Sequence, residues 1–413
     1  MSVEATTVPG ADRAEAWALG APRPSYRLRG VRAVLAERIV ENATITVEDG
    51  RIEDVTTGAS AGPGDRPVID GQNLLLLPGF VDVHSDALET ERTPRPGAEV
   101  PIEFAMASFE GRAAAAGTTT MFHGAAFQHQ NTRGVARRPD RALDLCGVAD
   151  TTPSYRVDHR VLHRLDVLSA AGATTLSRRI EALGRHRGGE PPALVSHEDH
   201  TPGQGQYADP SGLRRFMIER DGMSPDEADA RIGARVRASA ALADVRAANL
   251  DWLSGLARDG LIRLVGHDPD SPEAVDALAA RGGAVAEFPT TLAAAERARD
   301  RGLHVVAGAP NVLRGSSHSG NVSARELVSR GVVDALASDY LPTALLAAVT
   351  LLARDGIVDL PRAVGLITSG PARVAGLTDR GVIAPGMRAD LALVDDTGHW
   401  PYAVATLRAG AAT

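Results

Sequence analysis

Between residue 73 and about residue 340, the sequence alternates between short apolar runs and longer stretches rich in Ala, Arg and Glu. Short apolar runs predict strands that are buried on both faces, and the stretches between them predict connecting helices, among them residues 101–116, 211–242 and 272–281. Strands and helices in this alternation are typical of a parallel sheet closed into a (β/α)8 barrel, which is the fold that we expect. The strand-like runs are residues 74–84, 118–122, 159–166, 193–200, 262–267, 284–288, 305–309 and 334–339.

The two ends of the chain follow a different pattern, in which short strand-like runs are separated by turn signals. Such runs predict an antiparallel sheet, and we expect both ends to contribute strands to the same one. The predicted organisation is a flexible tail over residues 1–24, a small β-sandwich domain from residues 25–72 and 380–413, and a catalytic barrel over residues 73–379.

Composition restricts the compartment and the partners. The formal net charge of -8 disfavours nucleic acid and anionic membranes as partners, because both reward a basic surface. The single cysteine, Cys146, allows no intramolecular disulfide, which fits a reducing compartment. No run is long enough to span a membrane or to form a signal-peptide core. We expect a cytoplasmic enzyme with a small-molecule substrate, and a homo-oligomer stays open.

Lysine is absent from the chain, so all 44 basic residues are arginine. This excludes every mechanism that depends on a lysine side chain. Schiff-base chemistry, a phosphate-loop lysine and a carbamylated lysine that bridges two metal ions are therefore ruled out.

Most of the predicted strands end in histidine or a carboxylate. The active sites of (β/α)8 barrels lie at these carboxyl-terminal strand ends. Imidazole and carboxylate groups are the ligands of zinc, manganese and iron sites, so the pattern predicts a metal centre. His84 and Asp86, two positions apart on one strand, can point to the same ion. The other candidates at strand ends are Asp166, His200, His267, Glu287 and Asp339.

Each of these residues also has a structural interpretation. A single histidine at a strand end is more often a hydrogen-bonded core residue than a metal ligand, and Asp166 can pair with Arg164. Asp339 suits a general base for metal-activated water, but an aspartate there is also a favourable helix N-cap. Taken together the residues favour a metal site, because random placement rarely ends most strands in ligand types.

A polar, Gly-rich segment over residues 308–321 follows one of the predicted strands. Side-chain donors in such a loop can hold phosphate oxygens, and the alternative is an ordinary connection between strand and helix. The donors that we expect to contact substrate are Asn311, Arg314, His318 and Asn321.

Two stretches resemble signatures of the amidohydrolase superfamily: Pro78 to His84 in the first barrel strand and Asp379 to Leu391 near the C-terminus. More narrowly, the chain resembles the accessory hydrolases of carbon–phosphorus lyase. This resemblance covers about residues 51–393. Its motifs are His84-Ser85-Asp86, Thr93-Pro94-Arg95-Pro96, Asp199-His200-Thr201-Pro202-Gly203-Gln204, Glu287-Phe288-Pro289-Thr290-Thr291, residues 308–321 and Ser338-Asp339-Tyr340.

The resemblance implies hydrolysis of α-D-ribose 1-methylphosphonate 5-triphosphate to the 5-phosphate and pyrophosphate, with one or two divalent ions. Zinc is the first choice, and manganese and iron are alternatives. Asp339 is implied as the base, and Arg95 and Glu287 are implied as substrate contacts. The family has a glutamate where this chain has Asp166, which we expect to bridge the ions because no lysine is present. The implied metal ligands are His84, Asp86, Asp166, His200 and His267.

Three departures bear on the substrate. The family places a histidine at the position of Phe109 and basic residues at those of Gly97 and Gly205, and a triphosphate benefits from basic groups. The first alternative is therefore an enzyme of the same scaffold that acts on a C–N bond, such as an imidase, deaminase or deacylase. The second is a non-catalytic relative that keeps the barrel as an assembly scaffold, which predicts missing metal ligands.

Overall fold

The structure is a computed structural model, and it describes residues 24–58, 66–128, 131–132, 135–154, 156–184, 190–219, 221–317 and 320–409. Residues 1–23, in the predicted tail, and His318, a predicted substrate contact, lie outside the described residues. Within the described ranges, no helix combines the length and the apolar character needed to cross a membrane.

Eight parallel strands form the barrel, which confirms the predicted fold class. The sheet ladder runs from β6 to β15, and the Ser85↔Asp339 bridge joins its two outer strands. The ring therefore closes at the residues predicted to carry the chemistry. In ladder order the strands are β6 (Phe80–Ser85), β7 (Thr118–Phe127), β10 (Asp158–Asp166), β11 (Ala193–Glu198), β12 (Ile262–His267), β13 (Gly283–Glu287), β14 (His304–Gly308) and β15 (Ala335–Ala337).

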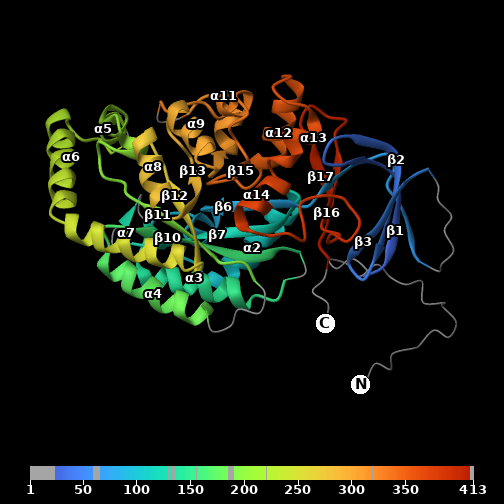
Figure 1. Cartoon of the computed structure of the whole chain (residues 1–413), viewed down its shortest axis with the longest axis horizontal. Helices are drawn as coiled ribbons and strands as arrows, with labels where there is room; N and C mark the ends of the chain where they lie inside the picture. Colours follow the sequence, from blue (N-terminus) through green and yellow to red (C-terminus); the bar gives the residue numbers. More distant parts are fainter. Residues whose placement is uncertain are drawn as a thin grey trace, which may run out of the picture.

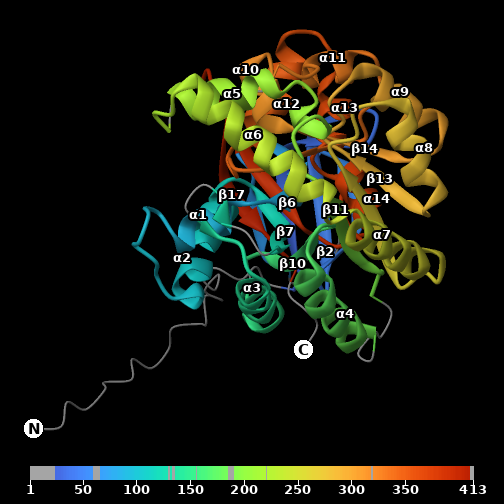
Figure 2. The same cartoon turned by 90° about the vertical axis from the view of Figure 1, so that its left-hand side faces the viewer.

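Helices surround the barrel and pack apolar side chains on its outer face, where they form the largest buried cluster (Figures 1 and 2). A second apolar cluster, which includes Val81, Leu162 and Val265, fills the interior. The helices are α1 (Ala87–Arg92), α2 (Ile102–Ala115), α3 (Pro139–Thr151), α4 (Ala170–Gly184), α5 (Pro210–Glu219), α6 (Pro225–Ala240), α7 (Ala243–Arg258), α8 (Pro272–Ala280), α9 (Leu292–Asp300), α10 (Ala309–Arg314), α11 (Ala324–Ser329), α12 (Ala344–Arg354), α13 (Leu360–Gly365) and α14 (Ser369–Ala375).

The helical stretch predicted over residues 211–242 forms two helices, α5 and α6, which project at one end of the barrel (Figure 1). A new helix begins after Ser224 because its side chain accepts the Glu227 amide while the Glu227 side chain accepts the Ser224 amide. This reciprocal capping box is a strong helix start. The pair follows β11, and Arg235 of α6 donates to the His200 carbonyl at 3.1 Å, so it lies beside the site.

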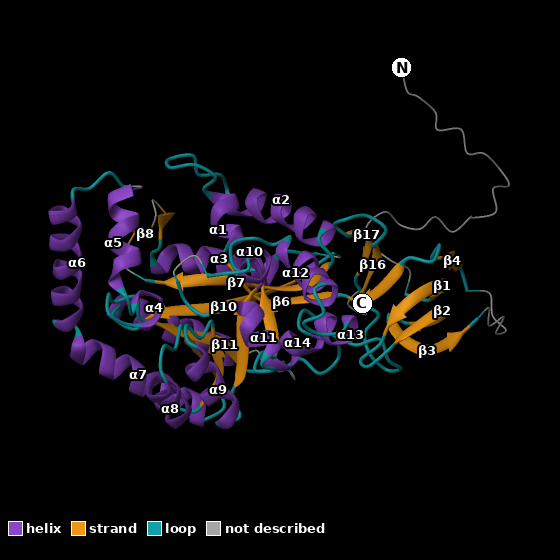
Figure 3. Cartoon of the chain, turned by 90° about the horizontal axis from the view of Figure 1, so that it is seen from above, coloured by secondary structure: helices purple, strands orange, loops and turns teal. Residues whose placement is uncertain are grey.

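Both chain ends build one seven-stranded sheet, as expected, and it lies beyond one end of the barrel (Figure 3). The predicted run 74–84 serves both sheets, because β5 belongs to the small sheet and β6 to the barrel. Gly79 separates them, and a Cβ there would lie 2.3 Å from Thr119 Oγ1. The sheet contains β1 (Tyr26–Val34), β2 (Ile39–Glu48), β3 (Arg51–Thr57), β4 (Val68–Asp70), β5 (Leu75–Pro78), β16 (Leu391–Asp395) and β17 (Tyr402–Leu407).

Candidate metal centre

Three residues at the ends of barrel strands have left-handed backbone: Asp268 (φ 51°) and Phe288 (φ 54°) directly follow β12 and β13, and Asp339 (φ 56°) lies two residues after β15. Each donates its amide to a carbonyl of the next strand: Asp268 to Glu287 at 2.8 Å, Phe288 to Val306 at 2.8 Å and Asp339 to His84 at 2.9 Å. A non-glycine residue in this region costs on the order of 1–3 kcal/mol and is concentrated at functional sites. The same turn thus recurs at three strand ends that carry site residues.

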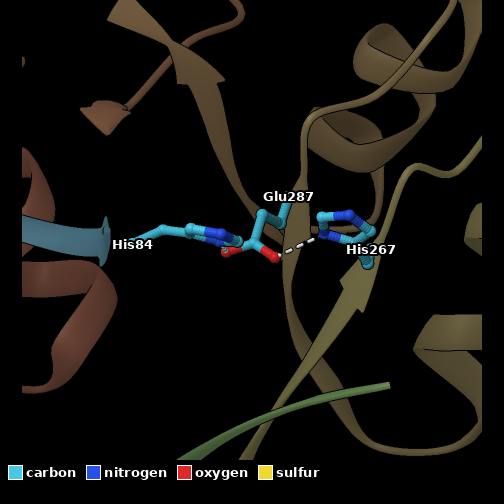
Figure 4. A group of neighbouring side chains, drawn as sticks. All are labelled: His84, His267 and Glu287. Atoms are coloured by element: carbon cyan, nitrogen blue, oxygen red, sulfur yellow. Dashed lines mark hydrogen bonds and ion pairs between the residues drawn. The ribbon is translucent and has the colours of Figure 1, made fainter. Parts of the chain in front are cut away.

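Glu287 lies between two imidazoles at the centre of the barrel mouth (Figure 4). Its two oxygens are 2.8 Å from Nδ1 of His84 and 2.8 Å from Nδ1 of His267. Ser196 Oγ donates to the second oxygen at 3.2 Å. With Nδ1–H donating to the carboxylate, each imidazole presents its Nε2 lone pair to an ion. Glu287 was predicted to contact substrate; in the structure its oxygens contact the two histidines, and the substrate contact stays a prediction.

The contacts between Glu287 and the two histidines shift the pKa values of these side chains. Burial opposes charge on Glu287, but His84 and His267 outweigh it and hold the pKa of this carboxyl far below its ordinary value. Burial likewise opposes protonation of His267, yet Asp268, Glu198 and Glu287 raise its pKa to about 9. A concentration of negative charge large enough to favour imidazolium is also one that favours a metal cation.

The structure brings most of the predicted ligands together in groups within which the possible ligand atoms lie within 4.8 Å of one another; besides the group of His84, His267 and Glu287 there are two more. The first consists of His84, Asp86 and Asp339, and the second of His200, His267 and Asp268. Three nitrogen or oxygen donors with room for a fourth are typical of catalytic zinc sites, so the residues fit divalent ions. Asp268 was not among the predicted ligands, although it directly follows His267.

Asp339 lies at the seam where the barrel closes. Its amide donates to the His84 carbonyl at 2.9 Å, and its carbonyl accepts the Asp86 amide at 2.7 Å. Burial and the nearby Asp86 raise the pKa of the Asp339 carboxyl above its ordinary value. A carboxylate with a raised pKa, adjacent to a metal position, is a better proton acceptor than an ordinary aspartate.

Two buried residues to which sequence reasoning gave no role in the site, Arg164 and Glu198, lie beside Asp86 and His200. The guanidinium of Arg164 donates through Nε to Glu198 and through Nη1 to Asp86. Gln128 Nε2 donates to the other Glu198 oxygen at 3.2 Å. Gly124 makes room for the pair, because a Cβ there would lie 2.6 Å from Asp86 Oδ1. The sequence signal was available, since Glu198 is two residues before His200 on the same strand end.

Asp166 is in neither ligand group. It ends β10 in register with Glu198 on β11, and its Oδ1 accepts the Leu168 amide at 2.9 Å. Its predicted role as a bridging ligand stays a prediction.

The predicted substrate contacts are dispersed around the mouth. Asn311 and Arg314 are on the short helix α10, and Arg314 is exposed. Asn321 is half-buried in the loop before α11. Arg95 is exposed after α1. These positions leave their roles as predictions.

A small cavity of about 30 Å³ lies beside Asp86, between α1 and α3. Its lining includes Glu89 and four arginines. One of them, Arg137, donates to Glu89 at 2.8 Å and to Asp86 at 3.3 Å, which connects the cavity with the first ligand group. The arginines are Arg92, Arg137, Arg138 and Arg141.

Comparison with known proteins accords with this geometry. The family model described as "Amidohydrolase family" matches residues 228–409. Over 369 residues the chain is 35% identical to the alpha-D-ribose 1-methylphosphonate 5-triphosphate diphosphatase of Escherichia coli (strain K12), covering 89% of this chain and 94% of that protein. The chain belongs to the amidohydrolase family. As a member it is a metal-dependent hydrolase, which the two ligand groups fit.

Solved structures of other proteins share the fold. A 5-methylcytosine deaminase from Klebsiella pneumoniae matches with a TM-score of 0.60 at 17% identity, covering 93% of this chain and 96% of that one. An N-acetyl-D-glucosamine-6-phosphate deacetylase from Mycobacterium smegmatis matches with a TM-score of 0.58 at 17% identity, covering 94% and 99%. At this identity the likeness extends to the architecture alone.

Proposed function

We propose that this hydrolase cleaves the triphosphate of α-D-ribose 1-methylphosphonate 5-triphosphate, leaving the 5-phosphate and releasing pyrophosphate. The observation that carries the proposal is the 35% identity to a diphosphatase of that name along 89% of the chain. A similarity that spans both the barrel and the small sheet favours a shared reaction over a shared scaffold alone.

The site offers the chemistry that this reaction needs. One or two divalent ions, zinc in the first place, supply Lewis acidity and lower the pKa of water. Asp339 accepts the proton of the attacking water because its carboxylate lies at the seam beside His84. Two fixed cations, Arg164 and Arg137, lie on either side of Asp86 and limit repulsion between the acidic centre and an anionic substrate.

Positive charge for the phosphates can come from two sides. Arg314 is exposed on α10, and the four arginines of the α1–α3 cavity lie beside the first ligand group. These groups offset the basic residues that the chain lacks at Gly97 and Gly205. Each cavity arginine also pairs with a carboxylate, so a phosphate there would exchange one anionic partner for another.

The test is pyrophosphate release from the ribose triphosphate by the metal-loaded enzyme. Turnover that requires metal supports the proposal, and no release with a full metal complement contradicts it. Arg314→Ala should weaken binding of the triphosphate by about tenfold, since a phosphate contact with arginine contributes roughly 1.5–3 kcal/mol. Binding of an uncharged ester should stay the same, and equal losses for both ligands would exclude a phosphate contact at this residue.

A C–N hydrolase is the second candidate, and one observation favours it. Phe109, where the related hydrolases have a histidine, is fully buried and packs edge-on against His123 at 5.6 Å between ring centroids. An apolar ring therefore takes the place of a polar group in the packing between α2 and β7. Turnover of a cyclic imide together with no pyrophosphate release would establish this alternative.

A further inference from the structure

Phe288 directly follows Glu287, the last residue of β13, and its backbone is left-handed with φ 54°. Side chains of consecutive residues on an extended strand point to opposite faces. Phe288 departs from this alternation. Glu287 contacts His84 and His267 through its oxygens, and the Phe288 ring packs against the same two imidazoles. The left-handed turn therefore brings two consecutive side chains to one pair of histidines.

This turn is held by the backbone and is unfavourable for a phenylalanine. The Phe288 amide donates to the Val306 carbonyl of β14 at 2.8 Å. Glycine adopts left-handed backbone readily, whereas a bulky side chain there is an outlier. Strain of this kind persists where the surrounding structure enforces it, and it is concentrated at functional sites. A phenylalanine at this position therefore indicates a role for its ring.

The Phe288 ring contacts both imidazoles. Its centroid is 5.0 Å from that of His84, with the ring planes tilted by 51°, and 5.7 Å from that of His267, in an edge-to-face arrangement at 73°. The two imidazoles are themselves nearly parallel, at 22° and 5.9 Å. Aromatic rings at such separations and angles attract one another. The Phe288 ring also packs against the apolar cluster that fills the barrel interior, and this cluster supports it.

Glu287 and the aromatic ring restrict the imidazoles in different ways. Glu287 fixes one atom of each imidazole, Nδ1, at 2.8 Å (Figure 4). A hydrogen bond to one atom leaves a planar ring free to tilt about that bond. The other ring nitrogen, Nε2, lies 3.4 to 3.5 Å from a carboxylate oxygen of its ligand group in both histidines. A packed neighbouring ring limits the tilt, so it fixes the direction in which each Nε2 lone pair points.

We propose that Phe288 is a positioning residue, which holds the imidazoles of His84 and His267 in the orientation that binds divalent ions. The strained backbone of Phe288 is then the cost of placing an apolar ring beside the ligands. Because the ring has no ligand atom, its effect on an ion acts entirely through the two histidines. The inference rests on the metal dependence of the proposed function and is independent of which substrate is cleaved.

The experiment compares Phe288→Leu with Phe127→Leu in the full-length enzyme. Phe127 is a matched control because its ring also stacks on a histidine, His163, with 6.1 Å between the centroids. His163 belongs to none of the ligand groups that the described residues form. Both changes replace a planar ring with a smaller apolar side chain, so both weaken packing, but only Phe288→Leu does so at the ligand histidines.

Competition with a chelator measures the affinity for Co²⁺, and the visible absorption of the bound Co²⁺ reports the geometry of its ligands. Phe288→Leu should lower this affinity by about tenfold, as loss of an outer support of metal-binding histidines does, and should change the absorption spectrum. Phe127→Leu should keep the affinity and the spectrum and lower only the unfolding free energy of the metal-free protein. Unchanged affinity and spectrum in Phe288→Leu, or equal losses of affinity in both variants, would overturn the inference.

A third variant separates the ring from the turn. Phe288→Gly adopts left-handed backbone without strain, so the protein should fold. It also removes the ring, so the affinity for Co²⁺ should fall as it does in Phe288→Leu. An affinity equal to that of the unchanged protein would contradict a role for the ring. Pyrophosphate release is measured separately, and no release by the unchanged enzyme with a full metal complement would disprove the proposed substrate while leaving the role of Phe288 intact.

Discussion

Buried charges are paired with opposite charges at one end of the barrel and crowded together without such partners at the other. At the amino-terminal end, Asp158 accepts hydrogen bonds from Arg380 at 2.6 Å and from Arg160 at 3.0 Å. Arg380 also reaches Thr120 of the neighbouring strand at 2.9 Å. At the carboxyl-terminal end, carboxylates and imidazoles crowd together with few fixed cations among them, and three residues there have left-handed backbone.

The difference separates stability from function within one ring of strands. Charges that pair within the protein leave nothing for a ligand to neutralise, and removing one partner destabilises the fold because the other is left buried and unpaired. Surplus carboxylates and strained turns cost stability but prepare a site for cations. Substitutions at the two ends should therefore change different measurements, activity and metal affinity at one end and unfolding free energy at the other.

The largest expected effect is that of Asp339→Asn. An amide cannot accept the proton, and general-base catalysis contributes about 10²–10⁴-fold. We expect kcat to fall by about 1,000-fold, with metal content retained because the amide oxygen of asparagine still offers a ligand atom beside His84 and Asp86; pyrophosphate release and elemental analysis measure the two. In the unchanged enzyme, activity should rise with pH through the raised pKa of Asp339, because only the ionised carboxylate is a base. A variant with full activity would remove the assigned base.

Next in size is Glu287→Gln. The amide keeps the shape, but it is a weaker acceptor for Nδ1–H of His84 and His267. Loss of such a partner to metal-binding histidines lowers metal affinity by about 10–100-fold. Competition with a chelator measures this, and Ser196→Ala serves as a milder control on the same carboxylate. Unaltered metal affinity would argue that Glu287 has another role.

At the opposite end, Asp158→Asn should cost about 2 kcal/mol of unfolding free energy at pH 7 and leave metal content unchanged. Burial opposes ionisation, but Arg160 and Arg380 lower the pKa of Asp158 to about 2. Because the pKa of Asp158 is lowered in the folded protein, its ionised carboxylate stabilises the fold at pH values above the ordinary aspartate pKa. This contribution to the unfolding free energy is lost as the pH falls toward 2. Urea unfolding at pH 7 and pH 3 should show the difference between variant and unchanged protein shrinking in acid.

The smallest effect should come from Arg214→Ala on α5. Its bidentate pair with Asp229 of α6 is well formed, at 2.7 and 3.0 Å, but both side chains are exposed. Exposed pairs contribute little to stability, because water and salt screen them. Unfolding free energy, metal content and activity should all stay near those of the unchanged chain. A large loss of activity would show that the α5–α6 pair takes part in the reaction.

The barrel was predictable because buried parallel strands leave a strong local signal. The apolar run at residues 262–267 corresponds to β12, and the run at residues 193–200 corresponds to β11 except that the strand ends two residues earlier. Other predictions were incomplete for local reasons that a pattern does not show. The run 74–84 divides at Gly79 between two sheets, and the stretch 211–242 divides where Ser224 caps a new helix.

The residue types of the candidate site were predictable from the sequence, but the contacts between its side chains were not. His84, Asp86, His200, His267 and Asp339 come together, as strand-end reasoning predicts. Glu287 orients two imidazoles, and Asp268 belongs to a ligand group. Sequence spacing alone does not distinguish these two carboxylates from the others at strand ends.

By itself, the sequence determined the class of fold, the end of the barrel at which chemistry takes place, and the exclusion of lysine from it. These follow from strand periodicity, from the polarity of parallel strands and from composition. Tertiary structure alone decided which carboxylate faces which partner. Arg164 lies between Asp86 and Glu198 only because the ring closes at Ser85 and Asp339 and because Gly124 leaves space for the guanidinium. Contacts between strands so far apart in the chain have no local signature.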